Sequence, residues 1–270
     1  MIIDCHTHLN NYHEERVRSI EACLEALQSE MAENNVDYAL VLSSYKVTEH
    51  RPPTRDVVKA VGKVKNVSTV AGISLTHYKE RDLRELSDFL SDGLVKGLKL
   101  YPGYEYYYPY DQRCQVIYDL AMEYDVPVMI HSGDTYSPTG KVRYSHPLHI
   151  DDVVVDNPGL KVVICHIGNP WIRDCMEVVY KNEHAYADVS GLVLGDFEDQ
   201  FERYMLQQVR EMIMYAGEPK YLLYGTDWPI CNMRSYLKFM RGLNLSDERM
   251  DQIMWKNAAD LFNIDVTQLK

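Results

Sequence analysis

The sequence predicts one α/β domain, a (β/α)8 barrel of the TIM type that spans residues 1–270. Eight short runs of apolar, often β-branched residues alternate with longer segments of helical spacing. Several runs are apolar at consecutive positions, as expected for parallel strands that are buried on both faces. Eight such units within about 250 residues match the size of a closed barrel.

The expected strands follow one another along the whole chain. They lie within residues 1–9, 36–44, 67–75, 94–102, 126–133, 160–168, 185–191 and 221–229. The segments between them are long enough for the crossover helices that parallel strands require.

Two of the helical segments have recognisable ends. Residues 14–35 place apolar side chains at three- and four-residue spacing and end in asparagine, a common helix stop. Residues 246–263 begin with Ser246, a favourable N-cap, and continue with Asp247 and Glu248, which complement the helix dipole. We expect a helix in each segment.

Composition excludes several classes of protein. The formal net charge of -12, without a basic tract, argues against nucleic-acid binding, which needs clustered Lys and Arg. No window approaches the roughly 18 apolar residues of a membrane span, and no secretory leader precedes the first strand, so we expect a cytoplasmic protein. Six cysteines without a Cys-x-x-Cys pair favour reduced, buried thiols.

Ionisable residues gather at the carboxyl ends of the predicted strands. They are His6 and His8 on the first strand, Lys99 on the fourth, His131 on the fifth, His166 on the sixth and Asp227 on the eighth. In a barrel these ends meet at one rim, which carries the active site. Burying so many ionisable groups is costly unless they are paired or bind a metal.

Imidazole and carboxylate are the ligands of catalytic zinc and related divalent metals. A metal site of this kind makes hydroxide available near neutral pH, and Asp227 could both bind the metal and accept the proton of water. The alternative is a polar network without metal, which would need a partner for every buried nitrogen and oxygen. Strand alternation is expected to point Cys5 and Cys165 toward the helix layer, away from the site.

Two long polar connections follow the fourth and fifth strands, at residues 101–113 and 132–152. The tyrosine-rich run from Tyr104 to Tyr110 could form an aromatic wall over the pocket or part of a subunit interface. Arg143, Arg173 and Arg234 follow strands and could bind an anionic group or form surface salt bridges.

Seven motifs occur in order over nearly the whole chain: "DCHTH", "GLKLYPG", "IHSGDT", "VVICHIGNPW", "YADVSG", "YGTDWP" and "KNAADLF". In these motifs the sequence resembles the amidohydrolase superfamily, and within it the amidohydrolase-related (amidohydrolase 2) group that includes relatives of aminocarboxymuconate-semialdehyde decarboxylase. The resemblance implies one metal ion held by His6, His8, His131 and Asp227. It makes His166 either a further ligand or the group that polarises the substrate.

The resemblance leaves the metal and the state of Lys99 open. Zinc is the usual ion in relatives, while others use manganese, iron or nickel. A lysine on the fourth strand is carboxylated in several superfamily members and bridges two metals. Lys99 could instead bind a substrate carboxylate as an ammonium, or pair with an acid at the rim.

The expected activity is therefore metal-dependent hydrolysis of an amide, ester or lactone in a small, carboxylate-bearing substrate. Asp227 would act as general base and then acid, while His166 and Lys99 would stabilise the oxyanion or orient the substrate. One alternative is a metal-dependent decarboxylase or hydratase of an unsaturated or aromatic acid, and another is a non-catalytic metabolite-binding barrel. The expected partner is a small molecule, with no nucleic acid or membrane, and homo-oligomers remain open.

Overall fold

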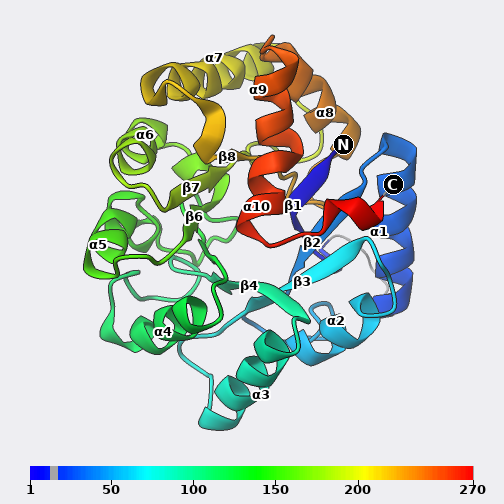
Figure 1. Cartoon of the computed structure of the whole chain (residues 1–270), viewed down its shortest axis with the longest axis vertical. Coiled ribbons are helices and arrows are strands. Elements are labelled where there is room, and N and C mark those ends of the chain that lie inside the picture. The colour runs from blue at the N-terminus through cyan, green and yellow to red at the C-terminus, as the bar shows by residue number, and fades with distance from the viewer. Residues whose placement is uncertain (13–17, 270) are drawn as a thin grey trace.

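The computed structural model describes residues 1–12 and 18–269, and it contains the predicted barrel. All eight predicted runs form strands, which are parallel and neighbour one another in sequence order. The strands are β1 (Ile3–Thr7), β2 (Tyr38–Leu42), β3 (Val67–Gly72), β4 (Val95–Leu100), β5 (Val128–Ile130), β6 (Val162–Ile164), β7 (Ala185–Asp188) and β8 (Leu222–Leu223). They form the central ring of Figure 1, and the helices surround it.

Backbone hydrogen bonds bring the last strand segment to the first and nearly close the ring. Cys5 N donates to Tyr224 O at 3.0 Å, and His8 N donates to Trp228 O at 2.8 Å. Asp227 N donates in the other direction, to His6 O at 2.7 Å. These bonds fix the chain that bears Asp227 directly beside the two histidines of β1.

The outer layer consists of helices between consecutive strands and after β8. They are α1 (Ile20–Asn34), α2 (Thr54–Val61), α3 (Glu80–Ser91), α4 (Gln115–Glu123), α5 (Leu148–Asp156), α6 (Ile172–Lys181), α7 (Asp199–Ala216), α8 (Met233–Gly242), α9 (Asp247–Asp251) and α10 (Asn257–Leu261). Among the described residues, no helix is long and apolar enough to cross a membrane.

Both helical segments with recognisable ends are helical. In the first, α1 begins after Ser19, whose side chain caps Ala22 N, and ends at Asn35 in the left-handed region with φ 56°. Positions 14–17 of that predicted segment lie outside the described residues. In the second, Ser246 caps α9 as expected.

The second segment is interrupted by a π-helical turn at Gln252–Lys256, which the sequence did not indicate. Ile253 O accepts a hydrogen bond from Tyr224 N at 3.0 Å, just beyond β8. A π turn frees main-chain groups from the regular helical pattern, so the helix can supply this bond to the barrel wall.

Apolar side chains fill the barrel below the ionisable rim. The interior cluster includes Ile3, Leu42, Val70, Met129, Val163 and Leu223. Ala258, Leu261 and Phe262 belong to the same cluster, and Lys96 Nζ at the start of β4 donates to Asn263 O. The C-terminal segment therefore packs at the amino-terminal ends of the strands, and the opposite mouth is left for the ionisable residues.

The prediction that Cys5 and Cys165 face the helices is wrong, because both belong to the interior cluster. Alternation holds as far as each cysteine, because Cys5 lies two positions after Ile3 and Cys165 two after Val163 in the same cluster, and it fails at the histidines that follow. The pairing register of β1 shifts between Asp4 and Thr7. β6 ends at Ile164, and the chain then turns through His166 at φ 60°, so its side chains no longer alternate as in a strand.

Candidate metal centre

A cavity of about 60 Å³ at the carboxyl ends of the strands is lined by all six predicted site residues. They are His6, His8, Lys99, His131, His166 and Asp227, and each is at most 8% exposed. The structure thus brings residues from five strand ends to one buried site, as the fold predicts.

His8 and His131 are each oriented by a main-chain carbonyl. His8 Nδ1 lies 2.8 Å from Leu42 O, and His131 Nε2 lies 2.9 Å from Asp134 O. Because a carbonyl oxygen only accepts, each bonded nitrogen bears the hydrogen. In the neutral rings this leaves a lone pair on Nε2 of His8 and on Nδ1 of His131, the form in which imidazole binds metals.

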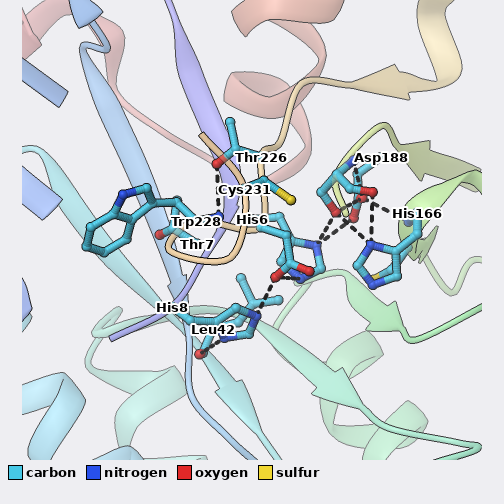
Figure 2. A network of polar contacts seen from close by, with 12 residues as sticks. His6, Thr7, His8, Leu42, His166, Asp188, Thr226, Trp228 and Cys231 are labelled. Carbon is cyan, nitrogen blue, oxygen red and sulfur yellow. Dashed lines mark hydrogen bonds and ion pairs between the residues drawn. The ribbon is translucent and has the colours of Figure 1, made fainter. Parts of the chain in front are cut away.

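His6 and His166 are oriented from β7. His6 Nδ1 lies 3.0 Å from a carboxylate oxygen of Asp188, and His166 Nδ1 lies 3.0 Å from Ser190 O, in the network of Figure 2. Both partners accept, so both rings bear hydrogen on Nδ1 and present Nε2 as a lone pair. All four imidazoles therefore have a defined tautomer with one nitrogen available for a ligand.

Asp227 completes a group of three ligand atoms with the two histidines of β1. Its Oδ1 lies 3.0 Å from His8 Nε2 and 3.8 Å from His6 Nε2. The ligand atoms of His6, His8 and Asp227 all lie within 4.8 Å of one another. Asp227 itself adopts φ 68°, the left-handed region that non-glycine residues seldom occupy, and this directs its carboxylate toward the histidines.

His131 and His166 lie beside this group rather than within it. The His166 ring centre is 5.0 Å from that of His6 and 5.1 Å from that of His131. The four rings thus form a continuous chain from His8 to His131, since His6 and His8 are 5.3 Å apart. His131 lines the cavity next to Tyr104, and their ring centres are 4.7 Å apart.

Burial sets the charge state of the donors. It lowers the pKa of His6 to about 4, although Asp188 opposes this shift in part. Burial and the nearby His166 also lower the pKa of His131. Burial by itself raises the pKa of Asp227, but the close approach of the His8 ring and the facing His6 and His166 rings outweigh it and lower the pKa overall. Neutral imidazoles around a carboxylate are the protonation states that a divalent cation needs.

Lys99 lies under the cavity with a thiol as its nearest polar neighbour. Its Nζ is 2.6 Å from Cys165 Sγ and 5.4 Å from the centre of the Tyr101 ring. Within the described part of the chain, no carboxylate oxygen lies within 4.0 Å of Nζ. The rim-acid pairing considered for Lys99 is therefore not the arrangement that the structure has.

The tyrosine-rich run divides between the site and the surface. Tyr104 lines the cavity, whereas Tyr106 and Tyr110 are each 47% exposed and Tyr107 is buried elsewhere. Tyr108 and Tyr110 stack at 5.2 Å outside the cavity.

The cavity lining includes none of the three arginines considered for anion binding. Arg143 donates to Tyr108 Oη, Arg173 lies 3.7 Å from a carboxylate oxygen of Glu211, and Arg234 is exposed on α8. The cavity is lined instead by Arg51, which follows β2 and lies 5.4 Å from the centre of the Tyr12 ring. The search for polar residues at strand ends missed Arg51, because it lies nine positions beyond Leu42, the last residue of β2.

Sequence reasoning also missed Asp188 and Ser190. Both lie in the motif "YADVSG", and Asp188 is the last residue of β7. An acidic residue at a strand's carboxyl end was the available signal.

The family model described as amidohydrolase matches residues 3–264. No curated protein sequence matches the chain. An uncharacterised TIM-barrel protein from Bordetella bronchiseptica superimposes with a TM-score of 0.74 at 20% identity, over 97% of this chain and 98% of that one.

Two further solved structures differ in their chemistry. A probable 2-pyrone-4,6-dicarboxylic acid hydrolase from Acinetobacter baumannii, solved with citric acid, has a TM-score of 0.69 at 15% identity, covering 97% of this chain and 99% of that one. A dihydroxybenzoic acid decarboxylase from Polaromonas, solved with manganese and an inhibitor, has a TM-score of 0.68 at 16% identity, covering 97% of each. At these identities the structural likeness supports the fold.

Proposed function

This chain belongs to the amidohydrolase family, and on that premise we propose that its barrel, residues 1–270, is a metal-dependent hydrolase of a small, carboxylate-bearing substrate. The observation that supports this best is the common orientation of the donors. Four buried imidazoles have defined tautomers, and a carboxylate lies between two of their lone pairs. Such a set of donors fits a divalent cation better than it fits a polar network in which every buried group has a protein partner.

The proposed ligands of one zinc ion are His6, His8, His131 and Asp227. Neutral imidazole and carboxylate are the donors of catalytic zinc sites. When bound, such an ion would polarise a substrate carbonyl and lower the pKa of water to about 7. A second ion would require carboxylation of Lys99, which lines the same cavity.

The proposed catalytic residues, Asp227 and His166, both line the cavity. Asp227 would accept the proton of the attacking water on a carboxylate oxygen and return it to the leaving group. His166 bears its hydrogen on Nδ1, so its neutral ring presents a lone pair at Nε2, which suits a ligand or a proton acceptor. Stabilisation of an oxyanion by His166 would first require this ring to take up a proton.

Two cations support a carboxylate-bearing substrate. Lys99 on β4 and Arg51 in the connection after β2 both line the cavity, and both can donate to a carboxylate. Tyr45, Tyr101 and Tyr104 line it as well and offer flat faces to an unsaturated or aromatic ring. This aromatic lining favours a second candidate, the non-oxidative decarboxylation or hydration of an unsaturated or aromatic acid at the same metal.

The first test is metal content per chain, measured by mass spectrometry on untagged protein purified without chelator. About one divalent ion per chain is expected, and two would favour carboxylated Lys99. Protein that is metal-free and takes up neither zinc nor manganese would refute the metal proposal.

The second test assays the metal-loaded protein on lactones, esters and amides of small carboxylic acids, and on aromatic acids with detection of carbon dioxide. Hydrolysis without carbon dioxide release is expected, and the reverse would establish the decarboxylase. Asp227→Asn should abolish turnover, and a metal-loaded variant with intact turnover would refute Asp227 as the base. Binding of an acidic metabolite without any turnover would favour the non-catalytic barrel.

A further inference from the structure

The carboxylate of Asp188 is fully buried and held from several directions. Its Oδ1 accepts from His166 N at 3.0 Å, from Ser190 N at 3.1 Å and from the Ser190 hydroxyl. Its Oδ2 is thereby directed at His6 Nδ1, 3.0 Å away. In Figure 2 Asp188 lies next to both His6 and His166.

The Ser190 hydroxyl links the same two histidines. It has a single hydrogen, which it donates to Asp188, so its lone pairs are left to accept. Its Oγ lies 2.9 Å from His6 Nδ1 and 3.0 Å from His166 Nδ1. One hydroxyl group therefore contacts the outward-facing nitrogens of two rings whose centres are 5.0 Å apart.

The other two imidazoles are held differently. Main-chain carbonyls orient His8 and His131, and a main-chain carbonyl is a neutral partner that does not ionise. Among the four rings, His6 is the one with a carboxylate at the nitrogen that faces away from Asp227. A carboxylate behind an imidazole increases the electron density at the opposite nitrogen and so strengthens it as a metal ligand.

We propose that Asp188 and Ser190 are a pair of positioning residues for the metal centre. The Asp188 carboxylate holds His6 in the Nδ1–H tautomer and strengthens Nε2 as a ligand. The Ser190 hydroxyl contacts both the His6 and the His166 rings and so fixes their orientation relative to each other. The metal-binding ring, His6, and the ring beside the substrate, His166, thereby keep a constant distance and angle. This inference rests on the proposed function, because it assigns a role around the metal.

Asp188→Asn is the first test, since it keeps the shape of the side chain. If the amide nitrogen faces His6 it can only donate, and His6 must move its hydrogen to Nε2 to accept. Zinc affinity, measured by competition with a chromophoric chelator, should fall roughly 10- to 100-fold. The matched control is Asp4→Asn: Asp4 is equally buried and accepts from His6 N and from Thr226, but within the described part of the chain it is bonded to no imidazole nitrogen. Its zinc affinity should stay within about threefold of wild type, the size of a weak hydrogen-bond effect.

Ser190→Ala is the milder variant and keeps the barrel intact if Asp188→Asn does not fold. It should lower kcat by roughly 3- to 10-fold, the effect of one hydrogen bond, with KM nearly unchanged. Ser132→Ala is its control, because the Ser132 hydroxyl is equally buried and bonds Ser145 O instead of a histidine. Equal kcat values for the two variants would contradict the assignment of Ser190.

Nitrogen NMR of the histidine rings in metal-free protein separates this inference from the proposed function. We expect hydrogen on Nδ1 of His6 in wild type and on Nε2 in Asp188→Asn. Unchanged His6 tautomer together with unchanged zinc affinity would overturn the assignment of Asp188. A tautomer change in a protein that binds no zinc even as wild type would support Asp188 as a positioning residue and reject the metal enzyme.

Discussion

Gly191→Ala should damage the site through a single added carbon. Gly191 follows Ser190 and has φ 63°, and a Cβ built there would lie 2.5 Å from His166 Nδ1 and 3.0 Å from Asp227 Oδ2. Ordinary contacts between heavy atoms are about 3.5 Å, so the His166 ring must move by roughly 1 Å or the chain must shift. The ring cannot move freely, because its Nδ1 is bonded to Ser190 O.

Two costs contribute to the expected loss of stability. A left-handed conformation costs a non-glycine residue roughly 1–2 kcal/mol, and overpacking a buried contact costs about 1–3 kcal/mol. Together they predict roughly 2–5 kcal/mol of unfolding free energy, measurable by urea denaturation. Turnover should fall on the order of 100-fold, because displacement of a catalytic group by about 1 Å has effects of that size.

Gly93→Ala isolates the backbone contribution. Gly93 has φ 68°, nearly that of Gly191, but a Cβ there would meet nothing within 4 Å among the described residues. It lies between α3 and β4, away from the cavity. This variant should lose only the roughly 1–2 kcal/mol of the backbone term and keep full turnover. Equal losses of stability in the two variants, with turnover intact in both, would show that the contact with His166 has no consequence.

Two further predictions concern charge. Acidifying the metal-free protein from pH 6.5 to 4 should remove roughly 3 kcal/mol of stability through His6, because burial lowers its pKa to about 4 and the unfolded chain takes up the proton first. Urea denaturation at several pH values should show a loss about 3 kcal/mol smaller in His6→Asn than in wild type, since the buried His131 contributes to the loss in both. Arg51→Met should raise KM for a carboxylate substrate by roughly 10- to 100-fold, which is the effect of losing a hydrogen bond to a charged group. The control Arg143→Met removes an exposed arginine outside the cavity and should leave steady-state kinetics unchanged. Similar KM values for both variants would exclude Arg51 from substrate binding.

The sequence predicted the parts of the molecule that depend on periodicity. Apolar runs identified all eight strands, and the rule that barrel strands end at one rim placed His6, Lys99, His131 and Asp227 around one cavity. Both inferences use only the order of residues along the chain. Neither requires knowledge of how any single strand departs from regular geometry.

The errors and omissions arise where the geometry departs from the regular pattern. The pairing register shifts within β1, so His6 reaches the site although its neighbour Cys5 faces the interior with Ile3. The left-handed turn at His166 likewise brings its ring to the site although Cys165 faces the interior with Val163. Asp188 was missed because its role depends on a contact with His6, 182 positions away in sequence. Periodicity contains no information about such a pairing.

The irregular backbone of the site is itself informative about function. His166, Ile167 and Asp227 adopt φ values of 60°, 45° and 68°, which cost non-glycine residues roughly 1–2 kcal/mol each. Glycine would remove this cost at all three positions but would also remove the imidazole and the carboxylate. The surrounding barrel maintains the strained turns: Asp188 binds His166 N, and His6 O accepts from Asp227 N. The same residues that orient the rings therefore also stabilise the strained backbone. Removing the Asp188 carboxylate should accordingly lower both metal affinity and the free energy of unfolding. Loss of the Ser190 hydroxyl should change mainly the relative orientation of the His6 and His166 rings.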